Sequence, residues 1–238
     1  MARLQVGLPD LVSDIAKYAN KFDMVELRPE PGQAPKPGTL RAWRKAVNPS
    51  FTFSVVLPKI VGSLAMTKAM EVALSEALAV ATTVEARCIV LSTPSEVRPT
   101  TATVNKLKAV IEKLPRPGVV LCWEPHGIWE RAEILSLAKQ LGVHAVVDAA
   151  QMAVPPGPVV YTRLRALGTH GAVSQKSLEN VAQQLSGRRD AWVVVEHRPS
   201  AARVKTELGR AVSETAAIPG PTVVRPAPGR LRADDEEQ

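Results

Sequence analysis

Short apolar runs alternate with longer amphipathic stretches along most of the chain. Eight runs are rich in valine, leucine and alanine, and most are continuously apolar, which is typical of strands that are covered on both faces. They occupy residues 4–8, 24–27, 51–57, 88–91, 119–123, 144–147, 159–164 and 192–195. This pattern predicts a parallel sheet rather than an antiparallel sheet with one solvated face.

The stretches between these runs have helical patterns in all but one of the longer connections. Helices are expected over residues 10–21, 39–47, 63–86, 100–113, 129–141, 174–185 and 200–212. Thr39 and Ser174 are predicted N-caps, and Gly142 follows the end of its helix as a C′ glycine should. Residues 149–158 have no helical pattern, and Pro155-Pro156-Gly157-Pro158 predicts a rigid loop there.

Eight strands with intervening helices predict an α/β fold of the TIM type, a parallel (β/α)8 barrel that is slightly reduced. The chain has 238 residues, which is near the lower end for this fold, and the missing helix and short loops account for the difference. An open doubly wound sheet is the alternative. No Gly-x-Gly-x-x-Gly follows the first strand, so a dinucleotide-binding version of that sheet is not supported.

The C-terminal part of the sequence changes character. A proline-rich segment starts at Ile218-Pro219-Gly220-Pro221, and Asp234-Asp235-Glu236-Glu237 nearly closes the chain. We therefore divide the chain into a barrel domain, residues 1–213, and a disordered tail, residues 214–238. Such a tail is either simply solvated or a docking segment for a protein partner.

Charge, cysteine content and the length of the apolar runs indicate which partners and which cellular compartment to expect. The formal net charge is +7, but Lys and Arg are scattered and are not interleaved with aromatic residues, so nucleic-acid binding is not supported. Cys88 and Cys122 lie inside apolar runs and are expected to be buried thiols in a reducing compartment. No apolar run approaches 18 residues and the N-terminus lacks a signal-peptide pattern, so we expect a cytoplasmic protein without membrane spans.

Ionisable residues gather where the predicted strands end. After the apolar run Val119-Val120-Leu121, side chains two apart share a face, which places Cys122, Glu124 and His126 together. Other strand ends carry Glu26 and Arg28, Lys59, Asp148, Arg163 and Arg165, and Glu196-His197-Arg198. Charges at the ends of buried strands are costly unless they are paired, solvated or bound to a ligand. In a parallel barrel these ends meet at one rim, where active sites of this fold lie.

We predict from this convergence a polar pocket at the C-terminal rim. The predicted catalytic residues are Glu26, Glu124, His126, Asp148 and His197, and the predicted substrate-binding residues are Arg28, Lys59, Arg163, Arg165 and Trp129. A carboxylate can act as a general base with a second acid or histidine returning the proton, and arginines can hold a carboxylate or phosphate. An ion-pair network without chemistry is the alternative for the same residues.

A metal site is a further alternative, because Glu26, Glu124, Asp148 and a histidine could together hold a divalent cation. The sequence has no compact ligand motif such as His-Glu-x-x-His, so neither a metal nor another cofactor is predicted. A serine or cysteine nucleophile has no Gly-x-Ser-x-Gly to support it, and Cys122 lies deep in its strand.

Several of these segments resemble, in order, the motifs of the family called domain of unknown function 72, the YecE-like proteins, in its shorter, archaeal-style members. They are Phe22-Asp23-Met24-Val25-Glu26, Phe51-Thr52-Phe53-Ser54-Val55 with Pro58-Lys59, Trp123-Glu124-Pro125-His126-Gly127-Ile128-Trp129, Val146-Val147-Asp148 and Tyr161-Thr162-Arg163-Leu164. The resemblance covers residues 4–212 and implies a TIM-type barrel. The family's activity is not established, so it implies fold more than function.

The chain departs from the family pattern at three rim positions. Arg163 is followed by Leu164-Arg165-Ala166 where the family has Arg-x-His-Gly, and Arg28 replaces an asparagine. Glu196-His197-Arg198 stands where paired asparagines are common. Our leading hypothesis is a hydrolase or isomerase that uses carboxylate acid/base chemistry on a small anionic substrate. The alternative is a catalytically degenerate barrel that acts as a binding or scaffold protein and recruits partners through the tail.

Overall fold

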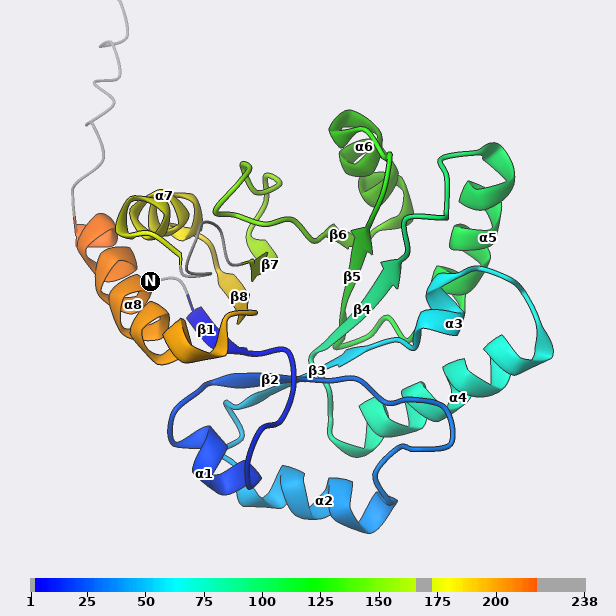
Figure 1. Cartoon of the computed structure of the whole chain (residues 1–238), viewed down its shortest axis with the longest axis horizontal. Helices are drawn as coiled ribbons and strands as arrows, with labels where there is room; N and C mark the ends of the chain where they lie inside the picture. Colours follow the sequence, from blue (N-terminus) through cyan, green and yellow to red (C-terminus); the bar gives the residue numbers. More distant parts are fainter. Residues whose placement is uncertain (1–2, 166–172, 218–238) are drawn as a thin grey trace, which may run out of the picture.

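Eight parallel strands curl into a barrel, and the helices lie around its outside (Figure 1). The computed structural model describes residues 3–165 and 173–217. The strands are β1 (Arg3–Leu8), β2 (Met24–Leu27), β3 (Thr52–Val56), β4 (Cys88–Thr93), β5 (Val120–Pro125), β6 (His144–Ala145), β7 (Val159–Leu164) and β8 (Asp190–Val195). The helices are α1 (Ile15–Ala19), α2 (Pro37–Ala46), α3 (Lys59–Gly62), α4 (Lys68–Thr83), α5 (Thr101–Glu112), α6 (Arg131–Leu141), α7 (Gln175–Leu185) and α8 (Ala201–Ala217), with the 3₁₀ turn η1 (Arg198–Ser200) before α8.

The barrel is closed everywhere except at one weak seam. The strand order is β6-β5-β4-β3-β2-β1-β8-β7, with every neighbouring pair parallel. Between β6 and β7 there is a single bridge, from Val147 to Thr162, supported by a 3.3 Å hydrogen bond from the Arg163 N–H to the Val147 carbonyl. This arrangement confirms the predicted TIM-type barrel. The connection from β6 to β7, which the structure describes completely, contains no helix, as predicted.

Three helix predictions need correction. The helix expected over residues 10–21 is shorter, because α1 spans only Ile15–Ala19 and has Asp14 as its N-cap. The helix expected over residues 63–86 begins only at Lys68, as α4, because Leu64 and Met66 adopt positive φ angles of 54° and 55° and separate it from the short α3. Thr39 is not an N-cap, because α2 begins at Pro37, whose fixed φ suits the first helical position. The predictions for Ser174 and Gly142 are confirmed: the Ser174 hydroxyl accepts from the Ser177 N–H, and Gly142 is left-handed with φ 65°.

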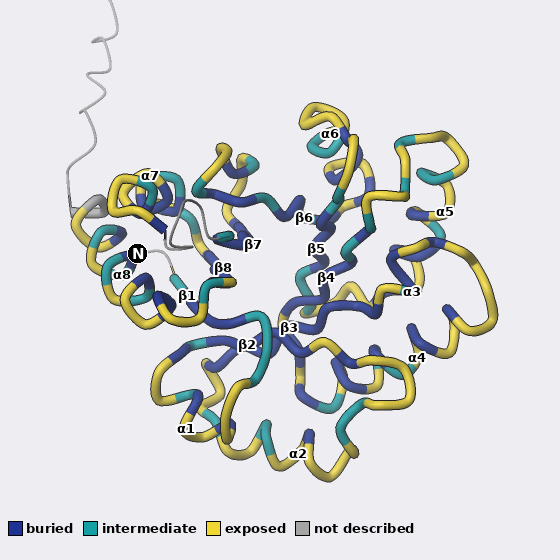
Figure 2. Tube along the Cα trace, viewed as in Figure 1, coloured by how far each residue is buried: buried dark blue, intermediate teal, exposed yellow. Residues whose placement is uncertain are grey.

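The buried apolar side chains form two clusters, one between the strands and the helices and one inside the barrel. Figure 2 shows the strands buried along most of their length, with exposed residues on the outer faces of the helices. The inner cluster consists of Met24, Val56, Cys88, Val90, Cys122, Val146, Val159, Tyr161, Trp192 and Val194. Burial raises the pKa of both cysteine thiols, which are free. Because side chains alternate along a strand, the next inward positions carry Glu26, Glu124 and Arg163.

None of the helices within residues 3–165 and 173–217 has the length and apolar character needed to span a bilayer. The predicted tail lies outside the described residues from position 218 onward. The helix α8 continues to Ala217, beyond the residue 212 at which the sequence pattern ends it.

Candidate functional site

The deepest charged group at the C-terminal rim is Glu26, at an inward position of β2. Its side chain is fully buried, and both carboxylate oxygens accept from Arg163, at 2.7 Å from Nη1 and 2.7 Å from Nη2. Tyr161 donates its hydroxyl to Oε1 at 2.7 Å, and Arg28 donates Nη2 to Oε2 at 3.0 Å. Burial, with Glu26 beside it, raises the pKa of Tyr161, so the phenol stays protonated and can donate. A buried carboxylate with this many donors is fully compensated.

Arg163 connects Glu26 to the second carboxylate of the rim, Glu124 of β5. Its side chain is 2% exposed, and its Nε lies 2.9 Å from Glu124 Oε1, although the N–H is not aligned for a hydrogen bond. Burial alone would lower the pKa of Arg163, but the charges of Glu26 and Glu124 outweigh it and raise that pKa. Arg163 is therefore a permanent cation enclosed by two carboxylates.

Glu124 is shared among three cationic or ionisable neighbours. Its Oε1 accepts from Arg165 Nη2 at 2.6 Å, in addition to the contact with Arg163, while its Oε2 lies 3.8 Å from His126 Nε2. Burial would raise the pKa of Glu124, but the interactions with His126, Arg163 and Arg165 prevail and lower it to about 2. In this arrangement Glu124 is ionised at neutral pH and is a weak base.

Glu196 completes the ion network at the mouth of the barrel. It directly follows β8 and is about one third exposed, and its Oε1 lies 3.6 Å from Arg165 Nε and 4.0 Å from Arg163 Nη1. These longer contacts are weaker than the buried ones below them, because solvent screens the charges. The network therefore loosens from the lumen toward solvent.

His126 stands at the edge of this network and reaches solvent. It follows β5, its backbone N–H donates to the Thr93 carbonyl at 3.0 Å, and its Nε2 lies 3.1 Å from Ser92 Oγ. The chain turns at Gly127, where φ is +92° and a Cβ atom would lie 2.7 Å from the Ser95 carbonyl oxygen. Only glycine fits this turn, which ends the strand and leaves the imidazole at the rim with 40% of its side chain exposed.

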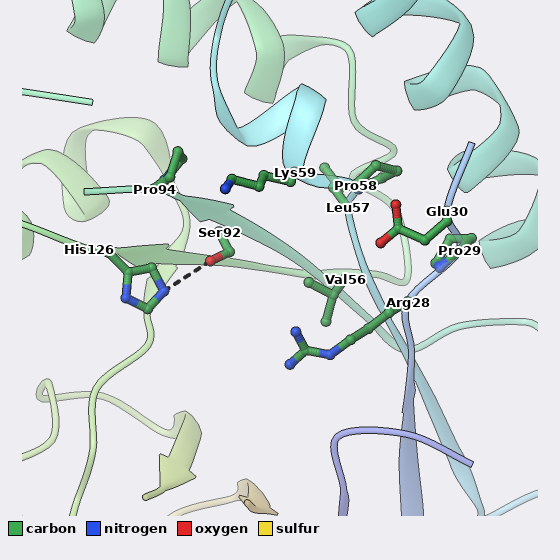
Figure 3. Close-up of a pocket in the computed structure, with 10 residues that line it drawn as sticks. All are labelled: Arg28, Pro29, Glu30, Val56, Leu57, Pro58, Lys59, Ser92, Pro94 and His126. Carbon is green, nitrogen blue, oxygen red and sulfur yellow. Dashed lines mark hydrogen bonds between the residues drawn. The ribbon is translucent and has the colours of Figure 1, made fainter. Parts of the chain in front are cut away.

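A pocket of about 210 Å³ opens beside His126. It is lined by Arg28, Pro29, Glu30, Val56, Leu57, Pro58, Lys59, Ser92, Pro94 and His126. In Figure 3 the Arg28 guanidinium and the His126 imidazole extend toward each other from opposite walls, and the Lys59 side chain lies on the Ser92 side. Within the part of the chain that the structure describes, the Lys59 side chain has no hydrogen-bond or ion-pair partner.

Three of the predicted site residues belong neither to this pocket nor to the ion network beside it. Asp148 is buried, but its oxygens accept from the backbone N–H groups of Ala150 and Arg165, at 2.9 and 3.1 Å, and from the Gln151 amide. His197 bonds Ser200 Oγ at 2.9 Å at the start of α8. Trp129 packs outside the barrel, where its Nε1 donates to the Val97 carbonyl at 3.0 Å. The other predicted residues converge at the rim: Glu26, Arg28, Lys59, Glu124, His126, Arg163 and Arg165.

Two further residues, Ser92 and Tyr161, contact the predicted site residues, although the sequence analysis assigns them no role. Ser92 follows Cys88 and Val90 at two-residue spacing on β4, which places it at an inward position next to His126. Tyr161 precedes Arg163 by two residues on β7 and bonds both Glu26 and Ser54 Oγ, the latter at 2.9 Å. Both residues follow from the alternation of side chains, because each lies two residues from another inward-facing position on its own strand.

The carboxylates of the rim do not form a metal-binding group. Among residues 3–165 and 173–217, no cluster of three or more His, Cys, Asp or Glu side chains is arranged to hold a metal ion. Glu26 and Glu124 face arginines, and Asp148 faces backbone and amide donors instead. These carboxylates are therefore already engaged by arginine, backbone and amide donors.

The sequence matches the family described as Protein of unknown function DUF72 over residues 7–225. The chain belongs to the DUF72 family. No curated protein matches the sequence. A solved DUF72 family protein from Enterococcus faecalis V583 is 13% identical, with a TM-score of 0.71 over 88% of this chain and 95% of that one. Another, from Thermotoga maritima MSB8, is 16% identical, with a TM-score of 0.63 over 87% of this chain and 99% of that one.

Barrels outside the DUF72 family share the fold. A structure of L-ribulose 3-epimerase is 14% identical, with a TM-score of 0.57, and the match covers 90% of this chain and 96% of that one. At this identity the likeness concerns the fold alone. Among the residues at which the sequence departs from the pattern that the resemblance implies, Arg28, Arg165 and Glu196 have ion-pair partners at the rim.

Proposed function

We propose that this DUF72 protein is an enzyme that transfers a proton to or from a small anionic molecule bound at the C-terminal rim. The observation that carries the proposal is the pocket lined by Arg28, Lys59, Ser92 and His126. Two cationic side chains bind the anion, and the imidazole exchanges the proton. The pocket, with a volume of about 210 Å³, is large enough for a small metabolite.

The imidazole suits proton transfer better than either buried glutamate. Glu26 has no exposed surface, and its oxygens are occupied by Arg163, Tyr161 and Arg28. Glu124 is held ionised by its arginine contacts, which makes it a poor acid and a weak base near neutral pH. His126 lines the pocket, with Ser92 and Glu124 to orient it, and an imidazole can both accept and donate a proton. We assign Glu26, Glu124, Arg163 and Arg165 to positioning.

Between the two reaction types expected from the sequence, we favour isomerisation. A single half-exposed imidazole with an adjacent anion-binding pair can move a proton within a substrate, and no serine or cysteine nucleophile lies in the described pocket lining apart from Ser92. Ser92 accepts or donates to His126 through an ordinary hydrogen bond of 3.1 Å. The fold shared with an L-ribulose 3-epimerase is compatible with this choice but is a fold-level analogy.

The first test measures binding. The full chain is screened by thermal shift against small phosphorylated and carboxylated hydroxy compounds, because a ligand that binds only the folded state raises its apparent stability. Lys59→Ala should remove most of the shift that a true ligand produces. Lys106→Ala, on the exposed face of α5, is the matched control and should leave the shift unchanged. Equal shifts in both variants would contradict the proposed pocket.

The second test measures chemistry. Each compound that binds is incubated with the protein in D₂O, and incorporation of deuterium at carbon is followed by NMR. His126→Gln should abolish the exchange while binding persists, and His144→Gln should not affect it, because His144 begins β6 beside Cys122 and does not line the pocket. Exchange that survives in His126→Gln would refute the role of the imidazole.

The scaffold alternative rests on residues 218–238, which lie outside the described residues, and stays a prediction. It is tested by pull-down with the full chain and with a chain that ends at residue 217. Identical partner sets would remove the tail's role.

A further inference from the structure

The charges of the rim cancel when His126 is neutral. The carboxylates of the pocket and of the network beneath it are Glu26, Glu30, Glu124 and Glu196, and the cations are Arg28, Lys59, Arg163 and Arg165. Four negative and four positive charges give a formal sum of zero. Asp148 is turned toward backbone and amide donors, and counting it would make the sum more negative.

An anion that enters a site of zero net charge leaves it with an uncompensated negative charge. Arg28 already donates to Glu26, so its charge is partly used before any ligand binds. Lys59 is the cation of the pocket lining that has no partner among the described residues. One further positive charge would compensate one negative charge of the ligand, and the His126 imidazole is the group in the pocket lining that can gain it by binding a proton.

The surroundings of His126 are suited to an imidazolium. From its own strand Glu124 presents Oε2 at 3.8 Å, and from β4 Ser92 presents a hydroxyl at 3.1 Å that can accept a hydrogen bond. Arg28 after β2 faces His126 across the pocket, and Lys59 of α3 lies on the Ser92 side. Both cations repel an imidazolium until an anion lies between them. A bound anion removes this repulsion, so the complex holds the proton more firmly than the free protein.

We infer that the ligand's anionic group binds between Lys59 and His126, and that His126 takes up one proton as it binds. The inference rests on the proposed function and names His126 as the third anion-binding residue of the same pocket. The proton is drawn from solvent, and no bond other than the new N–H forms. The imidazolium of the complex is an acid, so the proton abstraction that the proposed isomerisation requires takes place in the complexes in which His126 is unprotonated.

Inorganic sulfate is the probe, because it is an anion that does not itself titrate near neutral pH. Sulfate is titrated into the full chain at constant ionic strength, and calorimetric heats are compared in two buffers of different ionisation enthalpy to obtain the protons taken up. If one proton is taken up on binding, the dissociation constant should rise with pH toward a limiting slope of about tenfold per pH unit. His126→Gln should bind more weakly, with no such slope, whereas His144→Gln should keep it.

A direct readout comes from the imidazole signals, since the sequence contains 4 histidines and the His126 signal is identified by its loss in His126→Gln. Adding sulfate near pH 7.5 should move this signal toward the imidazolium position. Sulfate affinity that falls in Lys59→Ala but is independent of pH would overturn the proton uptake and leave the pocket intact. If Lys59→Ala leaves the sulfate affinity unchanged, as the control Lys106→Ala should, the pocket is not the anion-binding site, and the proposed function fails with it.

Discussion

Replacing Glu26 by glutamine tests whether the buried ion network is integral to the barrel. The substitution removes the charge that compensates Arg163 and places an amide N–H₂ group against guanidinium donors. Removing one partner of a buried pair costs about 3–5 kcal/mol, because the other charge stays buried. A domain stability of about 5–15 kcal/mol would therefore fall by a large fraction.

The assay is urea unfolding followed by tryptophan fluorescence, since Trp123 and Trp192 are buried. With a urea slope of about 2–3 kcal/mol per M, the midpoint should fall by about 1–2 M at unchanged slope. Arg163→Met should have a comparable effect. Because these residues are in direct contact, the double variant should cost less than the sum by about 1–3 kcal/mol.

The matched control is Glu71→Gln, which removes an exposed carboxylate that pairs with Lys113 at 2.8 Å. Its unfolding midpoint should stay close to that of the wild type, because solvent screens this pair. The reasoning is refuted if Glu26→Gln lowers stability by less than about 1 kcal/mol and the two single costs simply add in the double variant.

Three further predictions concern individual groups. Since the folded pKa of Glu124 is depressed to about 2 from an ordinary value of 4.5, its contribution is present above pH 4.5 and lost as the pH falls toward 2. Glu124→Gln should flatten the acid limb of a stability–pH profile, and an unchanged limb would contradict the assignment. Gly127→Ala should destabilise the protein by about 1–3 kcal/mol in thermal or urea unfolding, because φ is +92° there; a neutral effect would show that the turn can relax. Cys88 and Cys122, buried with raised pKa values, should react with a thiol reagent only after unfolding, and rapid reaction of the native protein would contradict their burial.

The strand pattern predicted the barrel because eight buried runs in a parallel sheet leave few other ways of covering both faces. The bounds of β2 and β7 agree with the predicted runs, and the predicted loop between β6 and β7 is confirmed. The interruption between α3 and α4 had no signal, since Leu64 and Met66 are not residues that favour a positive φ. Such backbone conformations are fixed by packing, as the full burial of Leu64 indicates.

The candidate site was predictable where strand alternation continued and not where it ended. Glu124 and His126 extend the inward face of β5, whereas Trp129 follows the turn at Gly127 and lies outside the barrel. His197 is adjacent to the inward Glu196 and therefore points elsewhere. By the two-residue alternation, the Asp148 side chain should point into the barrel. Its carboxylate instead accepts from the backbone N–H of Ala150 in the turn that follows, and residue spacing does not reveal this local hydrogen bond.

The charged residues of the rim also help to close the barrel at the weak seam between β6 and β7. Arg163 and Arg165 leave β7 and contact Glu124 on β5, so they reach past β6, and Asp148 after β6 accepts from the Arg165 backbone. These side-chain contacts therefore stabilise the junction of β6 and β7, which are joined by a single backbone bridge. A variant that lost all of these charged side chains would also lose these contacts across the seam, so the ion network and the closure of the barrel are coupled.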